Sequence, residues 1–148
     1  MKLSKWHSRY MAMAKLVSTW SKDPSTKVGA VIVDADNRLV SVGYNGLPQG
    51  IEDTDERLNN RELKYKIVVH AEKNAILFAQ RSVVACTLYT YPFLPCGPCS
   101  SFVIQAGIQQ VISIENDNPR WQDDFEITLD NFNEACIDTI LAEQKDWV

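Results

Sequence analysis

Hydrophobic residues near the amino terminus recur at the spacing of a helix. They stand three or four positions apart, which places them on one face of a helix and predicts that this face is buried. The residues concerned are Leu3, Trp6, Tyr10, Met13 and Val17. The step from Asp23 to Pro24 interrupts the pattern, because a residue that precedes proline disfavours helical backbone. We therefore expect a helix over residues 4–19.

The next hydrophobic stretches have the composition of β-strands. Residues 27–33 contain a nearly continuous β-branched run, and residues 38–44 follow after a polar turn at residues 34–37. A turn this short joins neighbouring antiparallel strands. The two stretches are therefore expected to form a hairpin.

Helix and strand patterns alternate in the second half of the chain. We expect a helix over residues 71–80, a strand over residues 86–91, a helix that begins near Pro98 and ends at Gly107, and a strand over residues 110–114. Proline suits the first turn of a helix, and glycine suits its end. A strand, a helix and a strand in this order form a βαβ unit, so the two strands should be parallel.

Two further segments carry weaker patterns. Residues 55–64 have few apolar positions and are expected to form a short helix, a candidate flap beside a ligand site. Near the carboxyl terminus we expect a short fifth strand over residues 125–129, a helix N-cap at Asp130 and a last helix over residues 131–142.

The length of 148 residues fits one domain that spans residues 1–148. Hydrophobic residues make up 45% and charged residues 23%, as is usual for a globular protein. No apolar run approaches the roughly 20 residues that span a bilayer, and the first residues lack the apolar core of a signal peptide. We therefore predict a cytoplasmic protein without a membrane partner, whose four cysteines favour thiol or metal chemistry over disulfides.

The net charge of −4 argues against a long nucleic acid as the partner, since proteins that bind one usually present a basic face. A local basic cluster does occur, and we interpret it as a solvated helix face. It consists of Arg57, Arg61, Lys64 and Lys66. The balance favours a small substrate, which can be anionic if a few cations meet it locally.

The chemistry of the chain concentrates in two motifs, His70-Ala71-Glu72 and Pro95-Cys96-Gly97-Pro98-Cys99. One imidazole and two thiolates leave zinc a fourth position for water, as catalytic zinc sites require. Glu72 is close enough in sequence to reach that water and move its proton. Residues two positions apart lie about 200° apart around a helix, so the helix must begin at His70 if both side chains are to face one metal.

Other interpretations of these motifs fit less well. A Cys-x-x-Cys pair alone is also typical of a redox pair or of half a closed zinc site. The redox interpretation gives His70 and Glu72 no role. A closed site needs a fourth ligand, and His7, Cys86 and Cys136 are not spaced to supply one. We interpret Cys86 and Cys136 as small buried hydrophobic residues.

A glycine-rich loop, Gly43 to Gly50, is a second candidate site. Asn45 within it offers both a donor and an acceptor, which suits a sugar hydroxyl. An Asn-Gly turn without a ligand is the alternative, and the nearby zinc motifs favour the ligand loop. Trp121 and Phe125 either cover the site or pack the core, and we favour packing.

The chain resembles the cytidine/deoxycytidylate deaminase family over residues 22–137. His-x-Glu with Pro-Cys-x-x-Cys is the signature of zinc-dependent nucleobase deaminases. Ser21–Pro24 and Gly43–Gly46 are similar to segments of the deoxycytidylate (dCMP) deaminase branch. The similarity also includes His70–Ile76, Leu94–Cys99 and Ile104–Ile108.

This resemblance implies an α/β fold, with three α/β/α layers around a mixed five-stranded sheet. It implies one Zn²⁺ per chain, held by His70, Cys96 and Cys99, with Glu72 as the catalytic residue. No second zinc is expected, because residues 51–69 contain neither cysteine nor histidine. The substrate contacts that we expect are Asn45 at the sugar, the Ala71 backbone at the base, and Lys22, Ser25 and Thr26 near the 5′-phosphate.

The activity implied by the resemblance is hydrolytic deamination of dCMP to dUMP with release of ammonia. A homo-oligomer, either a hexamer or a dimer, and dCTP or dTTP as effectors are implied as partners. Two alternatives stay open. One is a deaminase of another nucleoside, nucleotide or base, such as cytidine, dCTP or guanine, with tRNA disfavoured by the acidic charge. The other is a catalytically silent nucleotide-binding regulator, which the intact ligand set argues against.

Overall fold

The computed structural model describes residues 2–147. In chain order its elements are α1 (Lys5–Ser18), β1 (Gly29–Val33), β2 (Leu39–Tyr44), α2 (Asp55–Asn59), α3 (Arg61–Ile67), α4 (Ala71–Ala79), β3 (Thr87–Tyr91), α5 (Gly97–Ala106), β4 (Gln110–Ile114), the 3₁₀ turn η1 (Pro119–Trp121), α6 (Gln122–Glu134), β5 (Asp138–Ala142) and the 3₁₀ turn η2 (Gln144–Asp146). None of these helices is long and apolar enough to cross a membrane.

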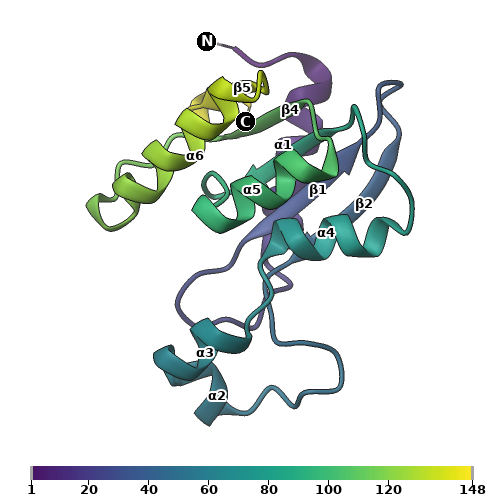
Figure 1. The fold of residues 1–148 in the computed structure, drawn as a ribbon. Helices are drawn as coiled ribbons and strands as arrows, with labels where there is room; N and C mark the ends of the chain where they lie inside the picture. Colours follow the sequence, from purple (N-terminus) through teal and green to yellow (C-terminus); the bar gives the residue numbers. More distant parts are fainter. Residues whose placement is uncertain (1, 148) are drawn as a thin grey trace.

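The five strands form one mixed sheet in the order β2-β1-β3-β4-β5. Strand β1 is antiparallel to both β2 and β3, whereas β3, β4 and β5 are parallel to one another. The hairpin and the parallel βαβ unit predicted from the sequence are therefore confirmed. Figure 1 shows how α1 lies behind the sheet while α4, α5 and α6 lie in front of it.

Helices cover both faces of the sheet, and the alternation of side chains along β1 explains why. Ala30 and Ile32 point into the core beneath α4, α5 and α6, while Val31 and Val33 point into the core beneath α1. All five residues of β1 are buried, as expected for a strand covered on both sides. The predicted three-layer α/β/α fold is confirmed.

Two glycines allow helices to approach the sheet closely. A Cβ atom on Gly29 would lie 2.2 Å from the carbonyl oxygen of Ala14 in α1. A Cβ atom on Gly43 would lie 2.4 Å from the backbone nitrogen of Ala75 in α4. Because α4 carries the His-x-Glu motif at its start, the missing side chain at Gly43 helps to set the position of the site.

The expected elements at the carboxyl end are wrong. Residues 122–134 form helix α6, and the fifth strand is β5 at residues 138–142. Phe125, Thr128 and Phe132 are buried at helical spacing, and packing of this face against α5 and the sheet overrides the local strand propensity. Asp130 is consequently an exposed residue within α6 and not an N-cap.

Two other expectations need correction, and one holds. The single helix expected over residues 55–64 is divided into α2 and α3 at Asn60, whose side chain caps α3 by accepting from the Leu63 backbone N–H. Cys136 is exposed with a φ of 60°, because it lies in the turn that ends α6. Cys86 is buried as predicted.

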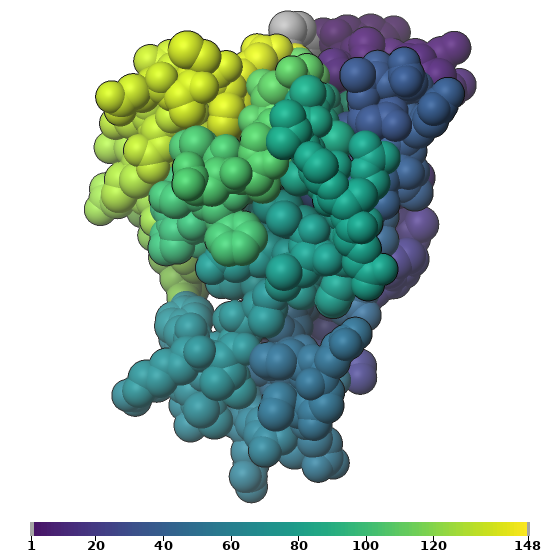
Figure 2. All heavy atoms as spheres, turned by 45° about the vertical axis from the view of Figure 1, so that its right-hand side comes forward, coloured from purple at the N-terminus to yellow at the C-terminus, as the bar shows by residue number. Residues whose placement is uncertain are grey.

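Figure 2 shows α2 and α3 as a lobe that projects below the main body.

Candidate active site

The two sequence motifs meet where two helices begin. His70 is the N-cap residue of α4, so its backbone is extended and Ala71 is the first helical residue. Cys96 is the N-cap residue of α5, and Cys99 lies in the first turn of that helix. The helix predicted to begin at Ala71 is therefore confirmed, and His70 meets the condition set for convergence on one metal because it directly precedes the first turn. This start lets the side chains of His70 and Glu72 approach one site.

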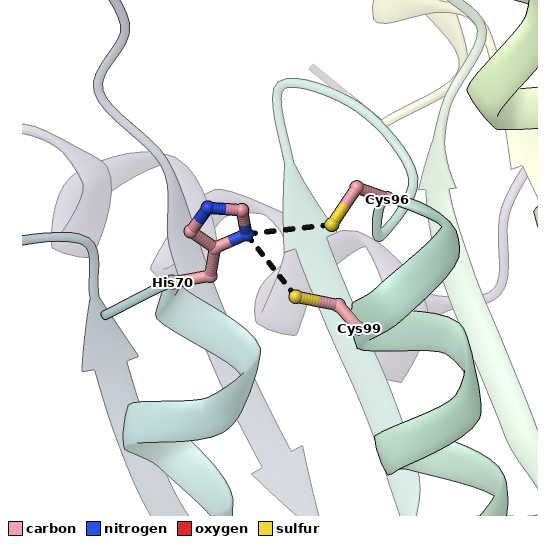
Figure 3. Close-up of side chains that lie close together, drawn as sticks. All are labelled: His70, Cys96 and Cys99. Carbon is pink, nitrogen blue, oxygen red and sulfur yellow. Dashed lines mark hydrogen bonds between the residues drawn. The ribbon is translucent and has the colours of Figure 1, made fainter. Parts of the chain in front are cut away.

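The three predicted metal ligands face one another (Figure 3). The Nδ1 atom of His70 lies 3.1 Å from Cys99 Sγ and 3.4 Å from Cys96 Sγ. Ligand atoms on a tetrahedral zinc, with bonds of about 2.0–2.3 Å, lie about 3.5 Å apart. The donor set and its spacing therefore fit zinc. Within residues 2–147 this is the one group of three or more ligating side chains close enough to hold a metal.

Hydrogen bonding within this cluster shifts the pKa values of the two cysteine thiols in opposite directions. The side chains of Cys99 and His70 both hydrogen-bond to Cys96, and they lower the pKa of its thiol to about 4. The pKa of the Cys99 thiol is raised, because it shares the proton of that hydrogen bond and is buried. Zinc binding would displace this proton, since both cysteines coordinate as thiolates. The site is thus set up to exchange a proton for a metal ion.

Glu72 lies beside the cluster as a buried carboxyl group. Its relative exposure is 3%, and burial raises its pKa because the charged form is poorly solvated there. The nearby His70 imidazole opposes this shift. A raised pKa brings the protonated and ionised forms of this carboxyl group closer in free energy, which suits general acid and base catalysis.

His70, Cys96 and Glu72 line one end of a cavity of about 320 Å³. Its middle is aromatic: Phe93 packs 5.7 Å from Phe125 and 5.8 Å from Trp121, measured between ring centroids. Phe125 also belongs to the hydrophobic core, so the two aromatic residues of α6 and η1 both pack and cover the site. Such walls offer flat surfaces against which a planar ring can stack.

The other end of the cavity is polar and basic. It is lined by Asp23, Ser25, Thr26, Arg61, Lys64 and Arg120. The Nζ atom of Lys64 lies 3.1 Å from Asp23 Oδ1, and both side chains are buried. The guanidinium of Arg120 donates to the neutral hydroxyl of Tyr65 and lies over the Trp121 ring, and within residues 2–147 it forms no ion pair.

The residues that sequence analysis proposed as substrate contacts separate into two groups. Ser25, Thr26, Asn45 and Ala71 line the cavity. Lys22 does not: it lines an adjacent hollow, its side chain is 71% exposed, and it pairs with Asp53 at 3.0 Å.

Asn45 also has a structural role that the glycine-rich loop did not reveal. Its Oδ1 atom accepts from the Val28 backbone N–H at 2.9 Å, and its Nδ2 atom donates to the Thr26 carbonyl at 2.9 Å. The side chain therefore fixes the segment that leads into β1. The side-chain amide of Asn45 has two N–H groups, and one of them makes the bond to Thr26.

Sequence analysis missed the cations of the basic end. The basic cluster of residues 57–66 was interpreted as a solvated face, which is wrong for Lys64, whose relative exposure is 5%. Arg61 and Lys64 are three positions apart on α3, so helical spacing places both toward the cavity. Arg120 lies 55 positions from Tyr65, and no local pattern links it to the site.

The comparisons with known proteins agree with this geometry. Residues 4–115 match the cytidine and deoxycytidylate deaminase zinc-binding region. The chain belongs to the cytidine and deoxycytidylate deaminase family. It is 44% identical over 139 residues to an uncharacterized deaminase of Aliivibrio fischeri, with 92% of each chain covered. The family binds zinc, and the group of His70, Cys96 and Cys99 is the part of the described chain that could hold this ion.

Animal relatives carry a more specific name. The chain is 44% identical to the deoxycytidylate deaminase of Mus musculus and 43% identical to that of Homo sapiens, each over 115 residues. These matches cover 72% of this chain and 63% of either relative, so the chain spans about three fifths of their length. The solved structure of the dCMP deaminase from cyanophage S-TIM5 shares the fold, with a TM-score of 0.74 at 24% identity, covering 95% of this chain and 99% of that one.

Proposed function

We propose that this protein is a zinc-dependent hydrolase that converts dCMP to dUMP and ammonia, with residues 1–148 acting as one deaminase domain. The observation that carries the proposal is a single cavity lined by His70, Cys96 and Glu72 and also by cationic side chains. Cys99 lies beside His70 and Cys96 and completes the group that could hold a metal. The relatives named deoxycytidylate deaminase support the same substrate.

Glu72 is the proposed proton carrier. Bound zinc would supply an activated water by lowering the pKa of that water toward about 7. Glu72 accepts the proton that this water loses and passes it to the ring nitrogen N3 of cytosine. The water oxygen forms a bond to C4, and Glu72 then takes the proton that remains on this oxygen and passes it to the amino group. The C4–N bond breaks, ammonia leaves, and C4 keeps a carbonyl oxygen. Burial of Glu72 supports both steps, because it brings the two protonation states closer in free energy.

The walls of the cavity are proposed to orient the nucleotide. The rings of Phe93 and Trp121 would stack against cytosine, and the Ala71 backbone would contact the edge of the base. Asn45 would bind a sugar hydroxyl through its second N–H, while its other polar atoms hold the Thr26–Val28 segment in place.

The basic end of the cavity is the proposed phosphate site. Asp23 neutralises Lys64 at 3.1 Å, so Lys64 mainly fixes the wall. Arg61 and Arg120 supply the uncompensated positive charge, and the hydroxyl groups of Ser25 and Thr26 are further donors. Arginine suits phosphate because its planar group donates two parallel hydrogen bonds. This assignment replaces Lys22 with the two arginines and retains Ser25 and Thr26.

A side-by-side assay tests the proposed substrate. Ammonia release would be measured on the zinc-loaded protein with dCMP, CMP, deoxycytidine and dCTP. We expect dCMP to be turned over much faster than deoxycytidine, because only the nucleotide carries a phosphate that can meet Arg61 and Arg120. The rates with CMP and dCTP then show how far the sugar and the number of phosphates matter. Equal turnover of deoxycytidine and dCMP would contradict the phosphate site, and no turnover of any cytosine compound with zinc bound would contradict the substrate class.

We also propose that copies of this chain associate. Three large hydrophobic side chains on α4 and α5 are strongly exposed: Leu77 by 59%, Phe78 by 51% and Phe102 by 41%. Exposed apolar side chains close together are typical of a protein interface. The surface formed by these two helices faces the viewer in Figure 2. Light scattering after gel filtration would give the number of copies.

A further inference from the structure

Helix α6 presents a polar stripe to the segment that carries both zinc-binding cysteines. Asp124, Thr128 and Asn131 stand at positions i, i+4 and i+7, which places them on one face of the helix. That face packs against α5 (Figure 1). We call these three residues the α6 clamp.

Each member of the clamp makes a hydrogen bond to residues 95–100. Asp124 Oδ1 accepts from the Gly97 backbone N–H at 3.2 Å. The Thr128 hydroxyl donates to the Pro95 carbonyl at 2.7 Å. The Asn131 amide donates to the hydroxyl of Ser100 at 3.2 Å. The three hydrogen bonds therefore hold the segment at Pro95, before the two cysteines, at Gly97, between them, and at Ser100, after them.

The contacts are tight and partly sealed from solvent. Thr128 and Ser100 are fully buried, and the Ser100 hydroxyl in turn donates to the Gly97 carbonyl at 2.6 Å. A Cβ atom on Gly97 would lie 3.1 Å from Asp124 Oδ1, so glycine permits the close approach of this carboxylate. Hydrogen bonds that are shielded from water in this way help to hold their members in one geometry.

The clamp replaces a cap that the helix cannot supply itself. Cys96 occupies the N-cap position of α5, but its side chain makes no capping hydrogen bond, because its sulfur faces His70 and Cys99. The first N–H groups of a helix need acceptors from elsewhere. Asp124 provides one, at Gly97. Helix α6 thereby leaves the cysteine sulfur free to bind the metal.

We propose that the α6 clamp is a set of positioning residues that hold Cys96 and Cys99 in the geometry that zinc requires. The inference rests on the zinc site of the proposed function, but it concerns metal binding and not the substrate. Because the ligands are already placed, little free energy is lost in ordering them when zinc binds. Groups that orient metal ligands in this way typically contribute about 10- to 100-fold to metal affinity.

The test compares clamp variants with matched controls. Thr128→Val keeps the shape and removes the hydroxyl, Thr128→Ser restores the hydroxyl, and Asp124→Ala removes the acceptor. Asp130→Asn changes an exposed residue of the same helix. Zinc affinity would be measured by competition with a chelating dye, and ligand geometry by the absorption bands of the Co²⁺-substituted protein. Thermal unfolding of the zinc-free protein would report the fold separately.

We expect Thr128→Val and Asp124→Ala to bind zinc about 10- to 100-fold more weakly and to shift the Co²⁺ bands, while Thr128→Ser and Asp130→Asn match the original protein. Zinc affinity within about twofold of the original in both variants, with only the melting temperature lowered, would overturn the inference. If Thr128→Val does not fold, Asp124→Ala and Asn131→Ala decide by the same criteria. Tight zinc binding without dCMP turnover would contradict the proposed function and leave the clamp intact.

Discussion

The side chains at the site differ in burial, in position within the cavity and in pKa, because their surroundings differ. Glu72 is buried beside the metal ligands, whereas Arg61 and Arg120 line the far end of the same cavity. Cys96 and Cys99 are only three residues apart, yet hydrogen bonding lowers the pKa of one thiol and raises that of the other. The environment that the fold creates, and not the residue type alone, sets these properties.

Glu72→Gln should abolish catalysis and leave the metal site intact. The amide has nearly the same shape but cannot carry a proton, and general acid and base catalysis is typically worth about 10²- to 10⁴-fold in rate. We expect turnover to fall by at least that factor, with zinc content and melting temperature unchanged. Turnover and bound zinc would be measured together, with Glu126→Gln on the exposed face of α6 as the control. Substantial residual turnover would refute the role.

Arg120→Ala should weaken the binding of dCMP much more than that of deoxycytidine. A charge-assisted hydrogen bond contributes about 1.5–3 kcal/mol, which corresponds to a rise of roughly 10- to 100-fold in KM for the nucleotide. The measurement is KM and kcat for both compounds. Lys22→Ala is the comparison, because Lys22 lies outside the cavity and should leave KM unchanged. A larger effect of Lys22→Ala would restore the assignment made from the sequence.

Helices and strands position the site through close packing and through their ends. Helix α4 lies directly on β2 where Gly43 has no side chain, and α1 packs on the opposite face through the ring of Tyr10 and the neighbouring His7. The site residues lie at the starts of α4 and α5, so any shift of these helices moves them. Stability and site geometry are therefore coupled at the level of the elements.

Gly43→Ala should destabilise the protein, and Gly46→Ala should not. The new methyl group at residue 43 would meet the Ala75 backbone nitrogen at 2.4 Å, whereas nothing lies within 4 Å of the corresponding position at residue 46. Overpacking of this kind costs about 1–3 kcal/mol. Chemical denaturation of both variants gives the comparison. Equal free energies of unfolding would show that α4 can move away from β2 at no cost.

The contact between α1 and β3 should make stability depend on pH through His7. Burial lowers the pKa of His7, whose Nδ1 atom lies 2.9 Å from the Tyr89 hydroxyl, and Asp138 opposes that shift. The unfolded chain therefore takes up the proton first as pH falls below about 6.5. The stabilising contribution is present above that pH and is lost as pH falls through the lower pKa of the folded state.

Replacing His7 should remove this part of the pH dependence. We expect the melting temperature of the zinc-free protein to fall less between about pH 7 and pH 5 in His7→Gln than in the original, because glutamine does not titrate. Zinc is left out because His70, the other histidine, is a proposed metal ligand. Identical slopes in the two proteins would show that His7 takes up its proton equally well when folded.

The whole molecule brings distant segments of the chain to one cavity. The first turns of α4 and α5 line this cavity together with α3, and residues of η1 and α6 complete its wall. The lobe is attached through the buried pair Lys64–Asp23 and through the bond from Arg120 to Tyr65. Figure 2 shows how this lobe projects from the body of the protein beneath α4.

Zinc should stabilise the entire fold, because its ligands join α4 to α5. A ligand present at a thousand times its Kd adds about 4 kcal/mol to the free energy of unfolding, or roughly 10 °C in Tm for a chain of this size. We expect a chelator to lower Tm by that order. His70→Ala is the control and should show no zinc-dependent change, and magnesium should not replace zinc. An equal response in His70→Ala would place the stabilising zinc elsewhere.

Sequence analysis predicted correctly the elements that depend on residues close together in the chain. It failed where an element depends on packing against distant segments. The end of α5 at Gly107 was predicted, because the preference for glycine after the last helical residue acts within a few positions. The start of α4 at Ala71 was predicted from the local hydrophobic pattern. Residues 125–142 were misassigned, because their helix and strand depend on packing against α5 and pairing with β4. This error also concealed the α6 clamp, whose spacing of four and three residues has meaning only on a helix.

The sequence by itself determined which residues are the predicted metal ligands and which is the proposed proton carrier. Residue types at fixed local spacing were enough, since coordination and proton transfer depend on the atoms that each side chain supplies. Only the tertiary structure decided which residues far apart in the chain come into contact. It buried Lys64 against Asp23, left Lys22 in solvent, brought Arg120 beside Tyr65 and set α6 against the cysteine segment. These contacts join residues far apart in the chain, and their free energy comes from packing and desolvation that no local pattern of residues records.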